Sequence, residues 1–382
     1  MSHEVLIVGG GPVGAALALA LADGGRSVLL ADARDEGLGD NDPRSLALSF
    51  GSRLILERLG VWGEIVPATP IETIHVSHRG AFGSAILASR DVGVPALGYV
   101  VPYASVRRAL RIGLERTSNA TLLAGLRAVD VQVNSASVCV RLEDGAQQRT
   151  ERSKLLAIAD GGTATTQSRT IRDYRQSAVV ANVLTSTPHH SRAFERFTST
   201  GPLALLPRER GYALVWTTTP EHATELCSLP VDAFLARLKR AFGDRVGDFT
   251  AVDDRTTFPL SLRIAHRPVT ERRVLLGNAA QTLHPVAGQG FNLGLRDAWE
   301  LSAELRRCPR ERVGAPELLA RYAARRRLDR GGGIWFTHGL ARIFSGDDAP
   351  LRLARGLGLA ALAAVPPAQD FLVRRMNFGA RG

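Results

Sequence analysis

Apolar runs and regions of alternating hydrophobicity divide the chain into predicted strands and helices. Residues 4–8 and 27–31 are short apolar runs, which are typical of buried parallel strands. Residues 15–22 lie between them and consist of alanine and leucine, which favour a helix. Residues 46–59 and 106–117 also have helical spacing. The order strand, helix, strand predicts a βαβ unit at the start of the chain.

The middle of the chain changes to the two-residue period of half-buried strands. Residues 71–77 and 85–87 have this pattern, and residues 121–142 are predicted as strand, turn and strand. Three further strands and one short helix are predicted at residues 178–184, 203–206, 212–217 and 234–242. We therefore expect a second, mostly antiparallel sheet inserted between pieces of the first.

Three glycines between the first predicted strand and helix have the spacing G-x-G-x-x-G: Gly9, Gly11 and Gly14. The first allows a tight turn, the second lets the backbone approach a pyrophosphate, and the third lets the helix pack closely on the strand. Asp32 ends the second strand, where a carboxylate accepts hydrogen bonds from ribose hydroxyls. Together these features predict a dinucleotide site, although the glycines alone would also fit a structural turn.

Two further features bear on the cofactor. The motif alone does not distinguish NAD from FAD, but the negative charge of Asp32 disfavours the 2′-phosphate of NADP at this site. The sequence has no second complete G-x-G-x-x-G. We therefore expect one tightly held dinucleotide, FAD, with NADH or NADPH as a transient electron donor.

Two polar residues at predicted element ends are further candidates for cofactor contacts. Arg44 precedes Ser45, the predicted N-cap of the 46–59 helix, and fits a phosphate contact and a solvated side chain equally well. Asp160 follows an apolar run at 154–159, at the edge where open α/β sheets bind ligands. A plain turn has the same composition as the Asp160 region.

A second glycine-rich block connects a predicted strand at 274–276 to a predicted helix at 292–304. Glycines there allow the backbone to lie against a flat ring, and a helix N-terminus stabilises negative charge on that ring. The residues of this block that we expect at the cofactor are Gly277, Asn278, Gly288, Gln289, Gly290 and Asn292.

Three blocks, at residues 9–14, 160–161 and 277–297, together make the sequence resemble the class A FAD-dependent aromatic hydroxylases. The variant Gly-Asn-Ala-Ala-Gln-Thr-Leu-His-Pro within the third block is similar to the ubiquinone-biosynthesis branch, in particular its 2-polyprenyl-6-methoxyphenol hydroxylases. The usual family form has aspartate at Asn278 and histidine at Gln281. The resemblance extends to residues 192–204 in the predicted second sheet.

The resemblance implies a fold, an activity and a mechanism. The fold is a Rossmann-like FAD-binding domain with an inserted, mostly antiparallel substrate sheet and a helical C-terminal part. The activity is hydroxylation of a polyprenylated (methoxy)phenol with O₂, through NAD(P)H-reduced flavin and a C4a-hydroperoxide. Three alternatives stay open: hydroxylation at another ring position, a flavin-dependent reductase or dehydrogenase of an isoprenoid, and a non-catalytic subunit that retains the fold.

Candidate catalytic and substrate residues follow from the same blocks. His284 and Pro285 are expected near the reacting ring, where the imidazole is either an acid or base or a structural side chain that positions the loop. The expected substrate-lining residues, which would look the same in an apolar core, are Leu203, Leu205, Pro207 and Val286.

Composition restricts the partners and the compartment. The net charge is +11, but its arginines are spread along the chain without a dense basic block, so we expect no nucleic-acid partner. Three isolated cysteines predict no disulfide framework and no metal site. The sequence contains no apolar run of about 18 residues and no signal-peptide pattern at its start. We expect a cytoplasmic protein, with contact at the inner membrane surface as an option.

The predicted domains are discontinuous in sequence. Residues 1–70, 101–172 and 265–310 are expected to bind FAD, and residues 71–100 and 173–264 to form the substrate sheet. Residues 311–382 are expected to form a helical region, in which arginines such as Arg355 and Arg374 flank apolar residues. This composition fits a membrane surface, other quinone-biosynthesis proteins or a homo-oligomer interface.

Overall fold

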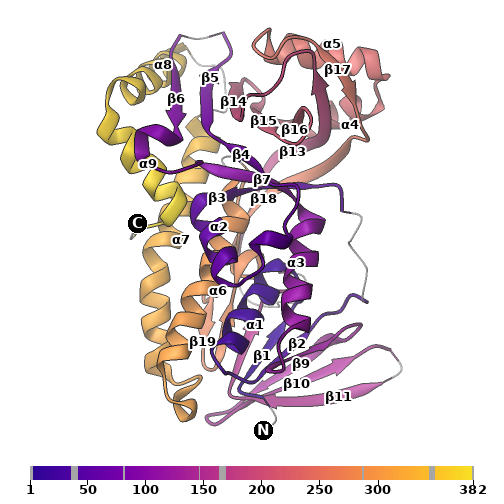
Figure 1. The fold of residues 1–382 in the computed structure, drawn as a ribbon, viewed down its shortest axis with the longest axis vertical. Coiled ribbons are helices and arrows are strands. Elements are labelled where there is room, and N and C mark those ends of the chain that lie inside the picture. The colour runs from indigo at the N-terminus through magenta and orange to yellow at the C-terminus, as the bar shows by residue number, and fades with distance from the viewer. Residues whose placement is uncertain are drawn as a thin grey trace.

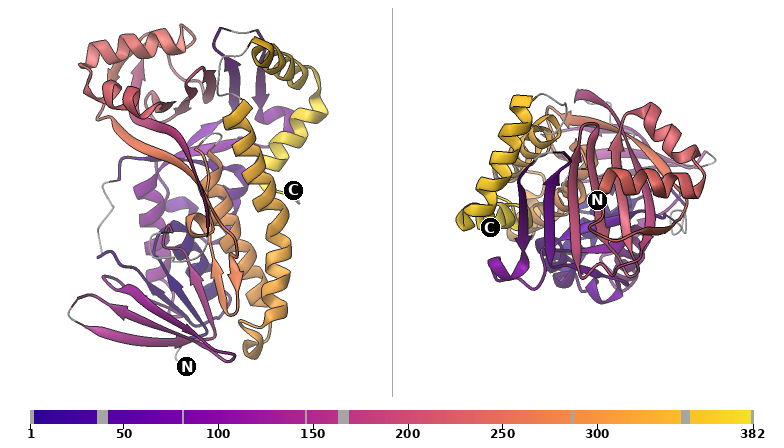
Figure 2. Two further views of the ribbon diagram at one scale, coloured as in Figure 1. Left: turned by 180° about the vertical axis from the view of Figure 1, so that it is seen from behind. Right: turned by 90° about the horizontal axis from the view of Figure 1, so that it is seen from above.

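The computed structural model describes residues 3–35, 42–80, 82–145, 147–162, 169–285, 288–343 and 349–380. The chain forms two sheet regions at opposite ends of an elongated molecule (Figure 1). Two long strands, β13 (Arg169–Thr185) and β18 (Thr256–Ala265), run between these regions (Figure 2). The Rossmann-like fold with an inserted antiparallel sheet is thereby confirmed.

The first region is a six-stranded sheet in the order β19-β20-β12-β1-β2-β8, parallel except for β19. Its strands are β1 (Val5–Val8), β2 (Val28–Ala31), β8 (Ala120–Leu123), β12 (Leu155–Ile158), β19 (Val269–Thr270) and β20 (Arg273–Leu275). Alternate residues face opposite sides: Val5 and Ile7 pack against helices, whereas Leu6 and Val8 pack against a small sheet.

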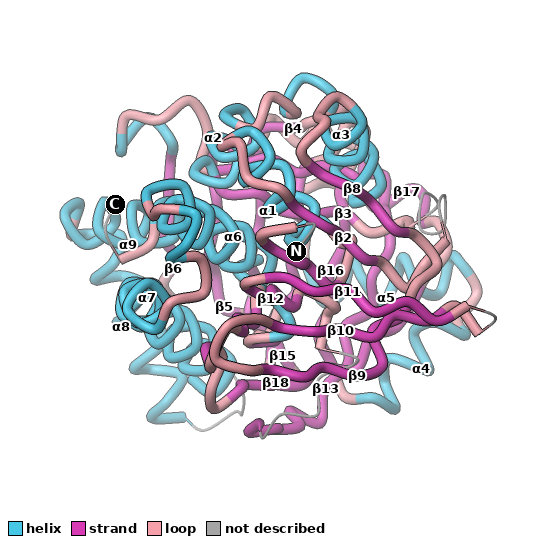
Figure 3. Tube along the Cα trace, turned by 90° about the horizontal axis from the view of Figure 1, so that it is seen from below, coloured by secondary structure: helices cyan, strands magenta, loops and turns pink. Residues whose placement is uncertain are grey.

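Helices and a small sheet cover the two faces of this first region. One face carries α1 (Pro12–Asp23), α3 (Tyr103–Glu115) and α6 (Gln289–Arg307). The other face carries the antiparallel sheet of β9 (Arg127–Val133), β10 (Val138–Glu143) and β11 (Gln148–Ser153) (Figure 3). Because both faces are covered, the central strands β1, β2 and β12 consist wholly of buried apolar residues.

The second region is a large, mainly antiparallel sheet in the order β21-β18-β13-β16-β15-β14-β5-β6, with β17 beside β13. Its other strands are β5 (Thr73–His78), β6 (Ser84–Ala88), β14 (Arg192–Thr198), β15 (Gly201–Pro207), β16 (Tyr212–Thr218), β17 (Phe249–Val252) and β21 (Gln281–Thr282). Helices α4 (Pro220–Ser228) and α5 (Val231–Phe242) cover one face with an apolar core. The opposite face is turned toward the candidate site.

The C-terminal helices lie along one side of both regions (Figure 2). They are α7 (Pro316–Ile343), α8 (Ala349–Ala364) and α9 (Pro366–Phe378). Helix α7 packs on α6, α8 on β5 and β6, and α9 on α2 (Phe50–Arg58). Among the helices described, none has by itself the length and hydropathy to cross a bilayer. The segments Leu353–Ala364 and Pro366–Phe378 reach that hydropathy only as a pair bent by 95°.

Between the two regions, the 46–59 helix of the sequence analysis begins later than predicted. Residues Ser45–Ser49 form strand β3, which pairs with β7 (Gly98–Pro102), and β4 (Thr69–Ile71) pairs with β7 on its other side. Helix α2 (Phe50–Arg58) follows, and its N-cap is Ser49, whose hydroxyl accepts from the Ser52 amide. Ser45 is therefore not the N-cap, because strand pairing with β7 outweighs the helical propensity of these residues.

Residues 121–142 also differ from the predicted single hairpin. Their first part is β8 at the edge of the parallel sheet, and only β9 and β10 form the hairpin of the small sheet. Short 3₁₀ turns complete the fold at η1 (Trp62–Glu64), η2 (Ser89–Val92), η3 (Gly277–Ala279) and η5 (Arg310–Arg312).

Candidate active site

A cavity of about 1280 Å³ connects the glycine turn after β1 to the open face of the large sheet. It exceeds the range of about 300–1,000 Å³ that is common for small-molecule pockets. One end is lined by Gly9, Gly11, Asp32 and Asp160, and the other by apolar residues of the sheet and of α8 and α9. A space of this shape has room for a long cofactor and a second ligand.

The first glycine turn brings strand and helix into backbone contact. Gly9 has φ +104°, and a Cβ there would lie 2.5 Å from the carbonyl carbon of Ala159 on the neighbouring segment. A Cβ at Gly14 would overlap the Gly9 carbonyl oxygen. A Cβ at Gly11, the N-cap of α1, would meet only the end of the Arg34 side chain, at 3.8 Å. The first-turn N–H groups of α1 are therefore directed at the cavity, as pyrophosphate binding requires.

Polar side chains surround this end of the cavity. Asp32 accepts from the Arg34 guanidinium at 3.1 Å. Burial lowers the pKa of Arg34, but the hydrogen bond and charge of Asp32 outweigh it and raise the pKa. Arg44 pairs with Asp42 at 2.6 Å and lies 4.9 Å from the centre of the Tyr103 ring. The cavity is lined by all four of these residues: Asp32, Arg34, Arg44 and Tyr103. The predicted phosphate contact of Arg44 stays a prediction.

The second glycine block forms the opposite wall of the same end. Gly277 has φ +54° and begins η3, and Asn278 is exposed toward the cavity. Gly288 has φ +60° and is the N-cap of α6. Asp160 follows the end of β12 and lies beside both glycine blocks. Its carboxylate accepts a hydrogen bond from the Gly162 amide at 2.8 Å. Helices α1 and α6 thus both begin at glycines that line one cavity.

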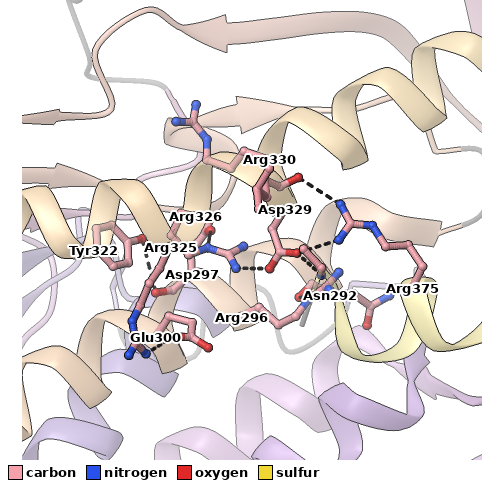
Figure 4. A network of polar contacts seen from close by, with 12 residues as sticks. Asn292, Arg296, Asp297, Glu300, Tyr322, Arg325, Arg326, Asp329, Arg330 and Arg375 are labelled. Atoms are coloured by element: carbon pink, nitrogen blue, oxygen red, sulfur yellow. Dashed lines mark hydrogen bonds and ion pairs between the residues drawn. The ribbon is translucent and has the colours of Figure 1, made fainter. Parts of the chain in front are cut away.

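A buried network of charged residues holds the second block from behind (Figure 4). Asp297 on α6 is 1% exposed and accepts from the Gly277 amide at 3.2 Å and from Arg326 Nε at 2.8 Å. Arg326 also pairs with Asp329, which contacts Arg375 on α9. Burial opposes the charge of Arg326, but the two carboxylates outweigh it and raise its pKa. The network fastens the Gly277 turn to α6, α7 and α9.

Gln281 belongs to this network and not to the cavity. Its side-chain amide donates to Asp297 at 2.9 Å, and its oxygen accepts from Arg330 Nε at 2.6 Å. Its side chain is 2% exposed. A residue that marked a family branch in the sequence therefore acts in the structure as a connector between the second glycine block and α7.

Asn292 lines the cavity, but its amide is fully engaged in holding the chain. It donates to the carbonyls of Ala47 (2.9 Å) and Gly288 (2.8 Å), and its oxygen accepts from the Ser49 amide (2.8 Å) and the Ser52 hydroxyl (2.7 Å). Its side chain therefore supports the turn, with four partners within the protein, and the predicted cofactor contact of Asn292 stays a prediction.

His284 and Pro285 differ in their exposure to the site. Pro285 lines the cavity, whereas the His284 ring is 1% exposed and packs edge-on against Tyr174, with ring centres 5.1 Å apart. Burial lowers the pKa of His284 to about 4. The imidazole is therefore neutral at pH 7, and this geometry favours the structural role. Val286 lies outside the described residues.

The predicted substrate residues of β15 lie on the wrong face of the sheet. Leu203 and Leu205 are fully buried against the helices of the α4–α5 side, and Pro207 has the same parity. The cavity is lined instead by Pro202, Ala204 and Leu206. The alternating pattern gives the period of a strand but not which of its two faces is turned to a ligand.

Three further polar residues of the site escaped the sequence analysis. Glu195 on β14 and Thr217 on β16 line the cavity, and Asp297 holds the second block. Polar neighbours hid the first two in the sequence, since Arg196 follows Glu195 and Thr218 follows Thr217, whereas Asp297 is an acid among apolar residues of a helix. Such residues stand out only once their strand or helix is known to face a cavity.

The residues present fit FAD. Two helix N-termini with glycine N-caps turn the partial positive charge of a helix start toward the same cavity. A side chain at Gly9 or Gly14 would strike backbone, so the turn keeps the close approach that a pyrophosphate needs. Asn278 presents a side-chain amide at the end of β20, where a hydroxylated chain of the cofactor would find hydrogen bonds.

Comparison with known proteins agrees with this geometry. A family model described as "FAD binding domain" matches residues 2–330. The ubiquinone hydroxylase UbiL of Rhodospirillum rubrum is 37% identical over 97% of this chain and 88% of its own length. The 3-demethoxyubiquinol 3-hydroxylase of Escherichia coli is 31% identical, with 94% of each chain covered.

A solved structure supports the fold. The p-nitrophenol 4-monooxygenase PnpA of Pseudomonas putida superimposes with a TM-score of 0.80, at 18% identity, over 100% of this chain and 99% of its own. The family is assigned from the sequence relatives, and this structural neighbour supports only the fold. The chain belongs to the FAD-binding-domain family and is an FAD-dependent monooxygenase of the group that includes the ubiquinone hydroxylases.

Proposed function

We propose that this protein hydroxylates the aromatic ring of a polyprenylated phenol in ubiquinone biosynthesis, with FAD as cofactor, NADH or NADPH as reductant and O₂ as co-substrate. The observation that carries the proposal is the single cavity that joins the two glycine turns to an apolar sheet face. The names of the sequence relatives supply the pathway, since they include ubiquinone hydroxylases.

We further propose that the parallel-sheet region binds the cofactor and the large sheet binds the phenol. When bound, FAD supplies the redox chemistry that activates O₂. The residues of the chain bind the cofactor, orient the phenol and exclude water. Gly9, Gly11 and the start of α1 hold the pyrophosphate, and Asp32 holds the adenosine ribose. Pro285 and the apolar sheet face keep water from the reacting ring.

The apolar end of the cavity suits a prenyl chain. Leu359 and Leu362 of α8 and Leu372, Val373 and Met376 of α9 line it. We propose that the prenyl chain extends between the large sheet and these helices, so the C-terminal region binds substrate with its inner side. Arg355, expected on the surface of this region, is instead 3% exposed and contacts His78 on β5 at 3.3 Å.

The outer side of the same helices fits a membrane surface. Leu353 and Leu357 on α8 and Phe371 on α9 are each more than half exposed. A polyprenyl substrate is dissolved in the bilayer, and the net charge of +11 attracts an anionic surface. We propose that this side meets the inner membrane and that the prenyl chain enters from it.

A matched pair of triple variants tests the membrane contact. Replacement of Leu353, Leu357 and Phe371 by glutamate is expected to abolish sedimentation with phosphatidylcholine–phosphatidylglycerol vesicles, while turnover of a short-chain prenylphenol persists. The control places glutamate at three exposed apolar positions of the sheet region: Ile171, Leu184 and Val231. Equal loss of vesicle binding in both triple variants would refute the assignment, because both change the net charge equally.

The pathway is tested by deleting the gene in the source organism and identifying the accumulated quinone precursor by mass spectrometry. We expect a polyprenylated phenol that lacks one ring hydroxyl, and its structure gives the ring position. Restoration by the intact gene is the control. An unchanged quinone pool with no precursor would contradict the proposed function.

A further inference from the structure

The sheet face that lines the cavity carries a carboxyl group, that of Glu195, around which apolar side chains lie. Glu195 lies in the middle of β14, and its neighbours in register are Val76 on β5 and Ala204 on β15. The next strand adds Val215, opposite Ala204. Phe197, two residues along β14, lies on the same face. The Glu195 side chain lines the cavity among these apolar groups.

Charged groups on the elements around Glu195 are directed elsewhere. On β14, Arg192 and Arg196 lie on the opposite face of the sheet, where their charges lie near His75 of β5. On β5, His78 shares the side of Val76 but is bonded to Arg355 of α8. On α9, Arg374 pairs with Asp370. Strands β6 and β15 carry no titratable residue.

The other titratable residues that line the cavity belong to its cofactor end. They are Asp32, Arg34, Arg44, Tyr103, Arg127 and Asp160. In the described part of the chain, the carboxyl group of Glu195 takes part in no hydrogen bond or ion pair, and burial alone raises its pKa to about 7. Placing a carboxyl group without a cation in an apolar wall costs folding free energy. A hydrophobic residue would pack there at least as well. Such groups gather at functional sites.

We infer that Glu195 binds the phenolic hydroxyl of the substrate and accepts its proton. The inference rests on the proposed function and names the group that prepares the ring for it. The O–H bond of the phenol breaks, the proton passes to a carboxylate oxygen of Glu195, and the electron pair stays on the phenol oxygen. The phenolate has more electron density at its ortho and para carbons, which is what attack on an electrophilic oxygen requires. The proton returns to the product oxygen after hydroxylation.

A second polar group on the same sheet face helps to orient the ring. Thr217 on β16 is fully buried, lines the cavity and has no hydrogen-bond partner for its hydroxyl among the residues described. Its strand position is offset from Glu195 across β15, since Ala204 pairs with Val215 and Thr217 is two residues further along. The two groups therefore contact different parts of a ligand, and Thr217 suits a second ring oxygen.

The variant Glu195→Gln keeps the shape of the side chain and removes its basicity. The substrate is a 2-prenylphenol with one or two isoprene units, and kcat/KM is measured between pH 5 and pH 9. We expect wild-type kcat/KM to rise with pH through about 7 as Glu195 ionises. In Glu195→Gln this limb is lost, kcat/KM at pH 7 falls by about 10²-fold, and activity returns only toward the phenol's own pKa of about 10.

Three further measurements separate this role from a structural one. Glu195→Asp is expected to recover part of kcat/KM with the pH limb retained, whereas Thr217→Val should raise KM and leave the limb in place. Glu209→Gln, at an exposed position in the turn after β15, is the matched control and should behave as wild type.

The outcomes distinguish the inference from the function on which it rests. If wild type hydroxylates the prenylphenol and Glu195→Gln, with normal FAD content, keeps both the pH limb and kcat/KM within about threefold, Glu195 is not the base. If Glu195→Gln does not fold, a wild-type kcat/KM that does not rise with pH through about 7 overturns the inference. If wild type hydroxylates no prenylphenol at all, the proposed function fails, and the role of Glu195 with it.

Discussion

The two glycine turns of the cofactor end look alike in sequence, but they are held by different means. The Gly9–Gly14 turn is fixed by backbone contacts, since side chains at Gly9 or Gly14 would strike the Ala159 or Gly9 backbone. The second turn, from Gly277 to Gly288, is held by side chains behind it, chiefly Asp297 and Asn292. The first turn therefore depends on the absence of side chains, and the second on the presence of distant ones.

Because of this difference, substitutions at the two turns are expected to have different effects. A change in the first turn disturbs a few backbone atoms next to the proposed pyrophosphate site. A change behind the second turn disturbs a network that also joins α6, α7 and α9. We therefore expect the second turn to be coupled to global stability and the first to be coupled mainly to cofactor retention.

The largest effect is expected from Asp297→Asn, which removes one of the two carboxylates that the buried Arg326 contacts and leaves Asp329 as the other. Breaking a buried ion pair by removing one partner costs about 3–5 kcal/mol. The free energy of unfolding in urea measures the loss, and the Gly277 turn should release FAD more readily. Glu300→Gln on the same helix is the control, because its half-exposed pair with Arg325 should contribute no more than about 1 kcal/mol. Equal losses in the two variants would contradict the account.

Gly14→Ala tests the first turn. The added Cβ overlaps the Gly9 carbonyl oxygen, and such overpacking costs about 1–3 kcal/mol. We expect this cost to be expressed as about 10- to 100-fold weaker FAD binding, with a smaller change in the unfolding midpoint of the FAD-free protein. Gly63→Ala, where an added Cβ meets no atom within 4 Å, should bind FAD as wild type does. Normal FAD affinity in Gly14→Ala would show that the close approach is not needed.

His284, beside the second turn, makes stability depend on pH. Its pKa is lowered to about 4 in the folded chain and is about 6.5 when unfolded, so the unfolded state binds more protons between these values. Folding stability is therefore lost as pH falls from about 6.5 to 4. Between pH 7 and pH 5 wild type should lose about 2 kcal/mol more than His284→Gln.

Urea unfolding at the two pH values measures this difference. The exposed His222→Gln variant should follow wild type. Parallel pH profiles of wild type and His284→Gln would contradict the buried, neutral imidazole. Hydroxylation per bound FAD at pH 7 should persist in His284→Gln, since the ring lies outside the cavity lining.

The smallest effect is expected at Asn278, which presents its amide to the cavity. One hydrogen bond contributes about 1 kcal/mol net, so Asn278→Ala should weaken FAD binding by about fivefold. Asn278→Asp retains an acceptor and should stay closer to wild type. Fluorescence titration of FAD measures both, and equal weakening in the two variants would remove the amide oxygen as an acceptor.

The sequence was sufficient to predict the first turn because its constraints are local. The spacing of Gly9, Gly11 and Gly14 lies within one strand–turn–helix segment and can be read there, although the backbone that Gly9 meets, at Ala159, is distant in sequence. The parallel strands were predicted for the same reason, since burial on both faces leaves a continuous apolar run in each.

Other features depend on packing between distant segments, and the sequence pattern does not encode them locally. Leu203 and Leu205 have the right period for a cavity wall, but helices α4 and α5 cover their face and leave Ala204 at the cavity. Residues 45–49 have helical spacing, but β7 recruits them as a strand. The Asp297 network joins residues up to 78 positions apart, from Asp297 to Arg375, which no short motif contains.

The central claim is that one cavity brings a phenol to a flavin that inserts oxygen into it. The direct measurement is turnover of a short-chain prenylphenol by the FAD-loaded protein with NADH under ¹⁸O₂, followed by mass spectrometry of the product. The account predicts a ring-hydroxylated product that carries one ¹⁸O atom from O₂. A product without ¹⁸O, or a reduced substrate with no added oxygen, would contradict it and favour a flavin-dependent reductase.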